Sequence, residues 1–236
     1  MFDNQISPAY YNQAAVARQT SAVMKRVYVR MFIGLLVSAF CALGVASSPA
    51  ALSFIFGNQI VFWGMLIAMF AMAIMIPVRL NKMSSGTVLV LFLVYAALMG
   101  TFLSSLFLAY RVGSIAATFF ITAGTFGAMS VYGYVTKRDL TKMGSFLTMA
   151  LFGLIIAMLV NMFLKSATMD YVVSIIGVLI FVGLTAWDTQ QVKQLAAANL
   201  ETSMTDKLAT MGAMNLYLDF INLFLFLLRI FGGNRN

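Results

Sequence analysis

The residue best placed to do chemistry in this sequence is Asp219, an acid within the last hydrophobic segment. It lies about eleven residues into that segment, which at 1.5 Å per helical residue is roughly 16 Å deep, near the middle of a membrane. A charge at that depth costs several kcal/mol unless it is paired, hydrated or protonated. Asp219 is therefore expected to be either a protonatable functional group or a satisfied polar group that locks helices together.

Polar residues accompany Asp219 along one face of the predicted helix. Asn215, Asn222 and Arg229 lie at offsets of −4, +3 and +10 from it, and at 100° per residue all four fall within an arc of about 80°. Phe226 interrupts this stripe. Because polar groups on a spanning helix favour the bundle interior or water, we predict that the last helix is central and that its polar stripe faces inward.

A second acid, Asp188, closes the sixth hydrophobic segment in the run FVGLTAWDTQ from Phe181 to Gln190. It shares a helical face with Ser174 and Thr185. The sixth and seventh segments are expected to be antiparallel neighbours. Asp188 would lie shallower than Asp219 unless the sixth helix continues past Gln190 and tilts. Two carboxylates held close together in low dielectric cannot both ionise cheaply, so they would titrate as a coupled unit.

Such a pair could sense pH, relay protons or bind a cation. Carboxylate oxygens favour hard cations such as Ca²⁺, which takes six to eight oxygen ligands, so Asp188 and Asp219 would need added carbonyls or water. Arg79, after Pro77 at the inner end of the second segment, is a candidate counter-ion. The alternative for Arg79 is an anchor whose charge reaches the membrane surface.

The composition requires lipid as the solvent for this chain. Of its 236 residues 62% are hydrophobic and 9% charged, and the mean hydropathy is +0.94, whereas a soluble domain carries roughly a quarter charged residues. The net charge of +8 does not indicate nucleic-acid binding, because the basic residues are scattered at segment ends. The chain has no histidine, so the commonest general base and transition-metal ligand is missing. We predict a protein that is not an enzyme and holds no cofactor.

The fold class predicted is an all-α membrane protein, a bundle of seven transmembrane helices with the seventh at its centre. Apolar runs of about twenty residues, as spanning helices require, divide the chain into a cytoplasmic, partly disordered tail over residues 1–24 and a single membrane domain over residues 25–236. The segment Thr189–Lys207 is predicted to be the one long loop. The seven spans are Val27–Ala46, Gln59–Val78, Thr87–Tyr110, Ser114–Tyr134, Ser145–Leu164, Tyr171–Asp188 and Leu208–Phe231.

The orientation follows from the basic residues. With the N-terminus in the cytoplasm, eleven lysines and arginines lie inside and four outside, as the positive-inside rule requires. Two of the outer four, Arg229 and Arg235, follow the last segment. They would lie inside if that segment re-entered the membrane rather than spanning it, and the sequence leaves this open.

Three stretches of the sequence resemble one known family. LYLDFINLFLFLLRIFG from Leu216 to Gly232 looks like the C-terminal signature of the Bax inhibitor family of transmembrane proteins. FVGLTAWDTQ and MSVYGYVTKRDL, the latter from Met129 to Leu140, resemble its other signature segments. The chain is most similar to the bacterial YbhL-like inner-membrane members. Trp187 stands where the family pattern has tyrosine, and Asp188 is kept.

The resemblance implies six helices around a central seventh and a pH-sensitive Ca²⁺ leak in a bacterial inner membrane. It also implies an aspartate pair that joins the sixth and seventh helices, matched here by Asp188 and Asp219. An arginine of the second helix that latches onto the pair is matched by Arg79 in position only. Only Gly232 to Asn236 follow the last segment. The charged tail of eukaryotic relatives is therefore absent, and suppression of cell death is not carried over.

Three functions compete at this point. The first is a Ca²⁺ leak gated by protonation of Asp188 and Asp219. The second is a modulator of a membrane quality-control protease or another membrane partner, engaged through residues 1–24. The third is an intramembrane aspartyl protease, which the sequence disfavours. The Gly-x-Gly-Asp motif expected for that chemistry is missing, since Tyr217 and Leu218 precede Asp219, and the proline motif that would follow it is missing too.

Overall fold

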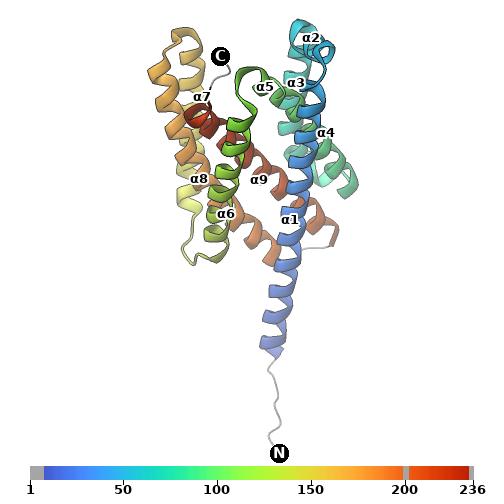
Figure 1. The fold of residues 1–236 in the computed structure, drawn as a ribbon. Coiled ribbons are helices and arrows are strands. Elements are labelled where there is room, and N and C mark those ends of the chain that lie inside the picture. The colour runs from blue at the N-terminus through green and yellow to red at the C-terminus, as the bar shows by residue number, and fades with distance from the viewer. Residues whose placement is uncertain (1–7, 199–201, 234–236) are drawn as a thin grey trace, which may run out of the picture.

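The computed structural model of the chain describes residues 8–198 and 202–233, which are helical apart from short turns. Figure 1 shows the helices running mostly along one common direction. The elements are α1 (Pro8–Ala46), α2 (Pro49–Gly57), α3 (Gln59–Val78), the 3₁₀ turn η1 (Leu80–Lys82), α4 (Ser85–Leu103), α5 (Leu106–Ala109), α6 (Val112–Val135), α7 (Thr141–Leu164), α8 (Ala167–Ala197) and α9 (Thr202–Phe231).

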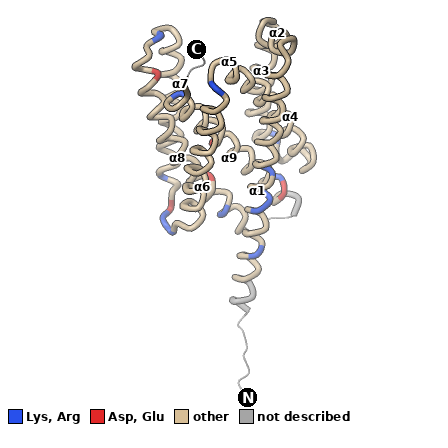
Figure 2. The backbone as a smooth tube through the Cα atoms, in the orientation of Figure 1, with Lys and Arg blue, Asp and Glu red and all other residues tan. Residues whose placement is uncertain are grey.

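The predicted fold class, an all-α membrane protein, is confirmed. Seven segments of the described chain are long and apolar enough to cross a membrane. Charged residues lie mostly toward the two ends of the bundle, with long uncharged stretches between them (Figure 2). This pattern follows from the cost of placing charge in hydrocarbon.

The last helix, α9, is central, as predicted. It packs against α1, α4, α6 and α8, whereas α7 packs on α8 and α3 packs on α4. In α9 72% of the most apolar window is buried inside the protein, against 11% in α3 and in α7. The picture of six helices around a seventh is therefore refined: four surround α9 closely, and α3 and α7 form an outer rank.

The predicted third span, Thr87–Tyr110, is not one continuous helix. It divides into α4 and α5 at Ser104 and Ser105. The hydroxyl of Ser104 donates to the carbonyl oxygen of Thr101 at 2.6 Å, and that of Ser105 to Phe102 at 2.9 Å. Serine hydroxyls that bond nearby carbonyls compete with the helical pattern and break it.

The predicted long loop Thr189–Lys207 is wrong. Helix α8 continues to Ala197 and α9 begins at Thr202, so most of that segment extends the two helices. The sequence does have polar residues there, but they cover the ends of helices that emerge from the apolar region rather than forming a loop. This extension of α8 past Gln190 is the condition on which Asp188 could reach the level of Asp219.

Helix α1 begins at Pro8, well before the predicted start of the first span at Val27. Residues 8–24, which the sequence assigned to a partly disordered tail, are thus helical, and residues 1–7 lie outside the described residues. At the other end of the chain, α9 runs the length of the bundle and its C-terminal end lies opposite the N-terminus (Figure 1). The last segment therefore has the length and direction of a spanning helix.

Candidate functional site

The site is built on the antiparallel pairing of α8 and α9. Phe181 of α8 stacks on Phe226 of α9, with ring centroids 5.9 Å apart and ring planes 27° apart. Asp188 and Asp219 lie seven residues, or two helical turns, from these rings toward the end of the bundle from which the N-terminal part of α1 projects, called the inner end from here on. Because one register relates both pairs, the two acids lie at the same level, and the predicted mismatch in depth is absent.

Asp188 and Asp219 are both buried, with exposures of 9% and 5%. Their carboxyl groups lie within hydrogen-bonding range of each other. Two ionised carboxylates have only acceptors, so this bond exists only when the pair holds a proton. Among the described residues no side chain or backbone donor bonds Oδ2 of Asp219, and a proton shared with Asp188 would satisfy it.

The helices around the pair supply no compensating charge. Helices α4 and α6 contain no charged residue, and α1 has none beyond Arg30. The other titratable groups of the core are tyrosines: Tyr95 of α4 and Tyr217 of α9 are both buried. The proton count of the aspartate pair therefore sets the charge at the centre of the bundle.

Asp188 and Asp219 are also the residues we predicted for Ca²⁺. In the described part of the chain no cluster of three or more His, Cys, Asp or Glu side chains could hold a metal ion. A cation at the pair would thus need carbonyl oxygens or water to complete its shell.

The other predicted site residues are placed as follows. Arg79 caps the C-terminus of α3, is exposed, and forms no salt bridge with described residues. The structure thus does not bring it to the pair, and its role as counter-ion stays a prediction. Asn215 and Asn222 are half-buried beside Asp219, whereas Arg229 is exposed at the outer end of α9. The inward stripe therefore ends before Arg229.

The stacked pair of Phe181 and Phe226 lies between the acids and the outer end of the bundle. The guanidinium of Arg229 lies 5.6 Å from the centre of the Phe226 ring. A Cβ added at Gly177 would overlap that ring, so α8 accommodates Phe226 by having no side chain there. Beyond Phe226 is an outer cavity of about 800 Å³ that Arg229 lines.

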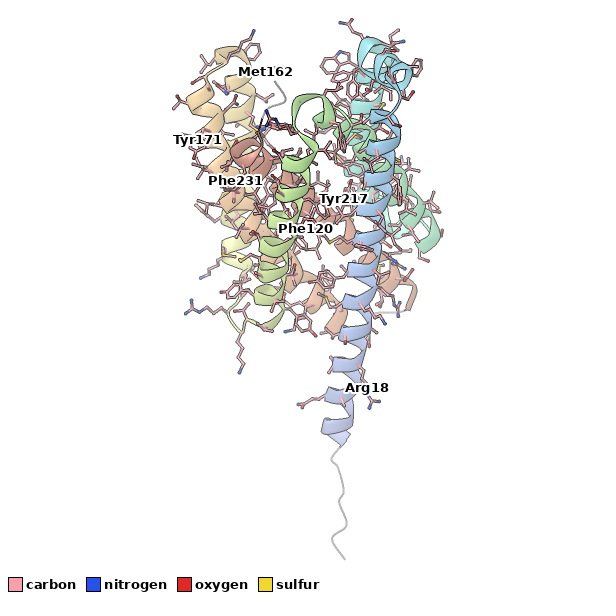
Figure 3. The ribbon with its side chains drawn as sticks, viewed as in Figure 1. Arg18, Phe120, Met162, Tyr171, Tyr217 and Phe231 are labelled. Atoms are coloured by element: carbon pink, nitrogen blue, oxygen red, sulfur yellow. The ribbon has the colours of Figure 1, made fainter. Side chains whose placement is uncertain are left out.

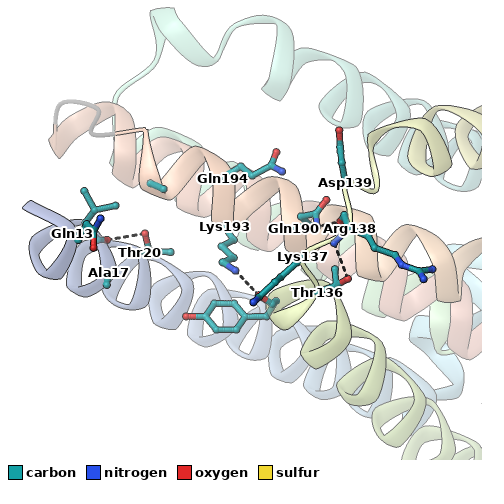
Figure 4. Close-up of a pocket in the computed structure, with 13 residues that line it drawn as sticks. Gln13, Ala17, Thr20, Thr136, Lys137, Arg138, Asp139, Gln190, Lys193 and Gln194 are labelled. Carbon is teal, nitrogen blue, oxygen red and sulfur yellow. Dashed lines mark hydrogen bonds between the residues drawn. The ribbon is translucent and has the colours of Figure 1, made fainter. Parts of the chain in front are cut away.

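A second cavity, of about 670 Å³, opens at the inner end between α1, the α6–α7 turn and α8. Figure 4 shows Lys137, Arg138 and Lys193 around it. Gln190 holds the turn on α8, because its amide nitrogen donates to the carbonyl of Arg138 at 2.8 Å and its oxygen accepts from the backbone of Leu140 at 2.9 Å. The final glutamine of the run FVGLTAWDTQ thus ties the inner turn to the helix that carries Asp188.

Sequence reasoning missed an ion pair between α1 and the start of α9. Arg30 donates to the Asp206 carboxylate at 2.6 Å, to the Asp206 carbonyl at 2.7 Å and to the Thr210 hydroxyl at 2.7 Å. Arg26 approaches the same carboxylate at 3.5 Å. Arg30 lies four residues after Arg26 on one helical face, and this spacing was the available signal.

Sequence reasoning also missed a buried polar contact two residues from Asp219. The hydroxyls of Tyr217 and Ser38 are 2.7 Å apart, and Ser38 donates to the carbonyl of Ala96 at 2.7 Å. Tyr217 is fully buried. This contact joins α9 to α1 and α4 next to the aspartate pair. The signal for it in the sequence was Ser38, a single serine in the apolar run of α1.

With this geometry established, comparison with known proteins decides the family. The model of the family described as "Inhibitor of apoptosis-promoting Bax1" matches residues 20–236. This chain belongs to the Bax inhibitor family. The predicted resemblance is confirmed, and the match extends over all seven spanning segments and both acids.

Several bacterial proteins are similar to this chain over almost their whole length. The "Inner membrane protein YbhL" of Escherichia coli K12 is 49% identical over 214 residues, which are 90% of this chain and 92% of that protein. An uncharacterised protein of Borreliella burgdorferi is 48% identical with the same coverage. One of Rickettsia prowazekii is 44% identical over 217 residues, 90% of each chain. The family and the seven helices make this chain a multi-pass membrane protein.

Proposed function

We propose that this protein is a non-enzymatic, pH-sensitive leak for cations, Ca²⁺ in particular, in a bacterial inner membrane, and that protonation of Asp188 and Asp219 gates it. The observation that carries the proposal is the contact between these two carboxyl groups, which are the buried acids of the described residues. The inner membrane is the location in the name of the similar protein YbhL. The cytoplasmic side of the N-terminus rests on the basic residues.

The charge of the pair changes with each proton. With one shared proton the pair carries a single negative charge and a hydrogen bond. Without it, two negative charges about 4 Å apart repel each other by roughly 4 kcal/mol at an effective dielectric of 20. A deprotonated pair must therefore separate or attract a cation, which can be either a permeating Ca²⁺ or the guanidinium of Arg79.

In this proposal the position of Arg79 decides whether the leak opens or closes as the pH falls. When the pair holds its proton, Arg79 is released and the leak can open. When the pair is deprotonated, Arg79 moves onto it and closes the leak. The released state binds more protons than the latched state, so linkage favours release as the pH falls and latching as it rises. The leak is expected to be faster in acid.

A conducting path along α8 and α9 has three parts. The outer cavity leads to the stacked Phe181 and Phe226, and the acids lie two turns beyond. The aromatic pair is the barrier that must move, because a stacked apolar contact excludes a hydrated ion. In this path the Phe226 ring is the plug, and the two acids beyond it form the site at which a cation binds transiently.

The test is Ca²⁺ flux into proteoliposomes at several pH values. Asp219→Asn keeps the shape of the side chain but cannot ionise, so the flux should lose its pH dependence. Arg79→Gln should keep flux at acidic pH and fail to close at high pH. Asp139→Asn, at an exposed loop acid, is the matched control. If Asp219→Asn leaves both the flux and its pH dependence unchanged, the proposed mechanism is wrong.

A second candidate function is modulation of a membrane partner such as a quality-control protease. The observation that favours it is the N-terminal part of α1, which projects beyond the bundle with Arg18 on it (Figures 1 and 3). A helix held away from its own bundle can contact another protein. Deleting residues 1–19 should then abolish regulation of the partner while sparing Ca²⁺ flux. Failure to recover any stable partner from detergent would count against this function.

A further inference from the structure

The outer cavity holds charges that do not pair with each other. It lies where the C-terminal end of α7, the first turns of α8 and the end of α9 meet, and it contains Lys165, Asp170 and Arg229. No salt bridge within 4.0 Å joins these three side chains, and the salt bridges found among the described residues are at the other end of the bundle, on Asp206. Two cations and one carboxylate therefore face one space of about 800 Å³ without neutralising one another.

Two of these charged groups, Asp170 and Arg229, have contacts that position their side chains, and Lys165 lies at the end of α7 beside them. Lys165 ends α7 in the left-handed conformation, with φ 51°. The Asp170 carboxylate accepts from the Asn161 amide at 2.7 Å, and the oxygen of Asn161 accepts from the backbone of Ser166 at 3.1 Å. Arg229 rests on the ring of Phe226. Positioned charges of both signs in one cavity are complementary to a ligand that also carries both signs.

The surroundings of the cavity indicate a membrane lipid. Its rim includes Met162 and Tyr171, which are 60% and 55% exposed and project from α7 and α8 (Figure 3). Both belong to spanning helices, so their outer faces meet lipid. Tyrosine is enriched where hydrocarbon gives way to headgroups. A cavity that is charged inside and apolar at its lipid-facing rim suits a headgroup with its acyl chains alongside.

We infer that the outer cavity binds the headgroup of a phospholipid that carries a phosphate and a primary ammonium, as in phosphatidylethanolamine. The phosphate would lie between Arg229 and Lys165, because a guanidinium binds phosphate oxygens through two parallel hydrogen bonds. The ammonium would donate to the Oδ2 atom of Asp170, because the amide of Asn161 bonds Oδ1. A choline headgroup has no N–H to donate, and a glycerol headgroup has no cation for Asp170. The inference does not rest on the proposed ion leak, although the same outer cavity forms the first part of the proposed path.

The test compares lipids with identical acyl chains on delipidated protein in detergent, with bound lipid counted by native mass spectrometry. Phosphatidylethanolamine should bind roughly tenfold more tightly than phosphatidylcholine or phosphatidylglycerol, because one hydrogen bond to a charged group separates them. Arg229→Gln should weaken all three. Asp170→Asn should remove only the preference for ethanolamine. Lys142→Gln, a basic residue near the inner end, is the matched control and should change nothing.

Three results would overturn the inference. One is equal binding of the three lipids by the unaltered protein. Another is an ethanolamine preference that survives in Asp170→Asn when the thermal unfolding of that variant matches the parent. The third is full displacement of the lipid by an equal concentration of soluble phosphoethanolamine, which would make the ligand a free phosphate ester. Because no ion flux is measured, failure here is distinguishable from failure of the leak.

Discussion

Helices α9 and α3 are both long and apolar enough to cross a membrane, yet α9 is mostly buried in the protein and α3 mostly faces outward. The difference follows from their polar residues. Helix α9 carries Asp219 and two asparagines, whereas α3 is apolar on every side. Lipid solvates an apolar helix as well as protein does, so burial in a membrane follows polar content rather than hydrophobicity.

The comparison also separates the closely packed centre of the molecule from its outer rank. The aspartates lie on α8 and α9, which the bundle holds, while Arg79 lies at the end of α3 in the outer rank. A latch needs one fixed partner and one movable partner. We therefore expect substitutions along α9 and its neighbours to be costly, and equivalent substitutions on α3 to be tolerated.

The largest difference is expected between two phenylalanines. Phe226 of α9 is 5% exposed and stacked on Phe181, whereas Phe70 of α3 is 68% exposed. Phe226→Ala should destabilise the protein by about 3–5 kcal/mol, as burial losses of this kind do, and should raise the Ca²⁺ leak at every pH by removing the plug. Phe70→Ala should leave both nearly unchanged. Unfolding in detergent and flux in proteoliposomes measure the two effects, and equal costs at the two sites would break the comparison.

The ion pair between α1 and α9 should give the next largest effect. Arg30→Gln removes a guanidinium that is 15% exposed and makes three hydrogen bonds to Asp206 and Thr210. Its loss should cost about 1.5–3 kcal/mol. Arg26→Gln, at the more exposed arginine on the same carboxylate, should cost roughly 0–1 kcal/mol. Thermal unfolding of the two variants side by side would show whether this clamp holds α9 in place.

Close helix approach provides a third contrast. A Cβ at Gly133 of α6 would overlap the backbone carbonyl of Ala186 on α8, whereas a Cβ at Gly64 of α3 would meet nothing within 4 Å. Gly133→Val should therefore destabilise by about 1–3 kcal/mol, the usual cost of overpacking, and Gly64→Val should not. The same valine is introduced in both, so a similar loss of thermal stability would mean that α6 and α8 need no close approach.

Much of this molecule was accessible from its sequence, and the reasons for the exceptions are physical. The spans, the central last helix and the level of Asp219 follow from the cost of charge in lipid, which acts locally along the chain. The break at Ser104 and Ser105 was missed because a hydroxyl that bonds its own backbone looks identical to one that packs between helices. The clamp on Asp206 was missed because its partners lie 176 residues apart.

The site was likewise accessible only in part. Asp188 and Asp219 meet because α8 continues to Ala197, and no local signal separates a polar helix extension from a loop. The outer cavity was invisible, because Lys165, Asp170 and Arg229 converge only after three helices have packed. Arg79 is the opposite case. Its position in the sequence suggested a counter-ion for the aspartate pair, whereas in the structure its side chain is exposed.

The smallest effect is expected at Asp139. This residue lies in the turn between α6 and α7, outside both α9 and α3. Hydrogen bonds from the Thr141 side chain and then its backbone lower the pKa of this exposed carboxyl below its ordinary value of 3.8. The stabilisation from a lowered pKa is present above the unfolded value and is lost as the pH falls through the folded value. Thr141→Val should therefore lower the melting temperature slightly at neutral pH, and a gap that widens in acid would contradict this sign.

The central claim is that Asp188 and Asp219 titrate as one unit. Infrared spectroscopy of the protein in lipid, with the protonated carboxyl band followed against pH, tests it most directly. Replacing either acid by asparagine should shift the midpoint at which the remaining band titrates by more than about one pH unit, as coupled groups require. If the band of Asp219 titrates at the same pH with and without the Asp188 carboxyl, the two acids act separately and the account of the gate is wrong.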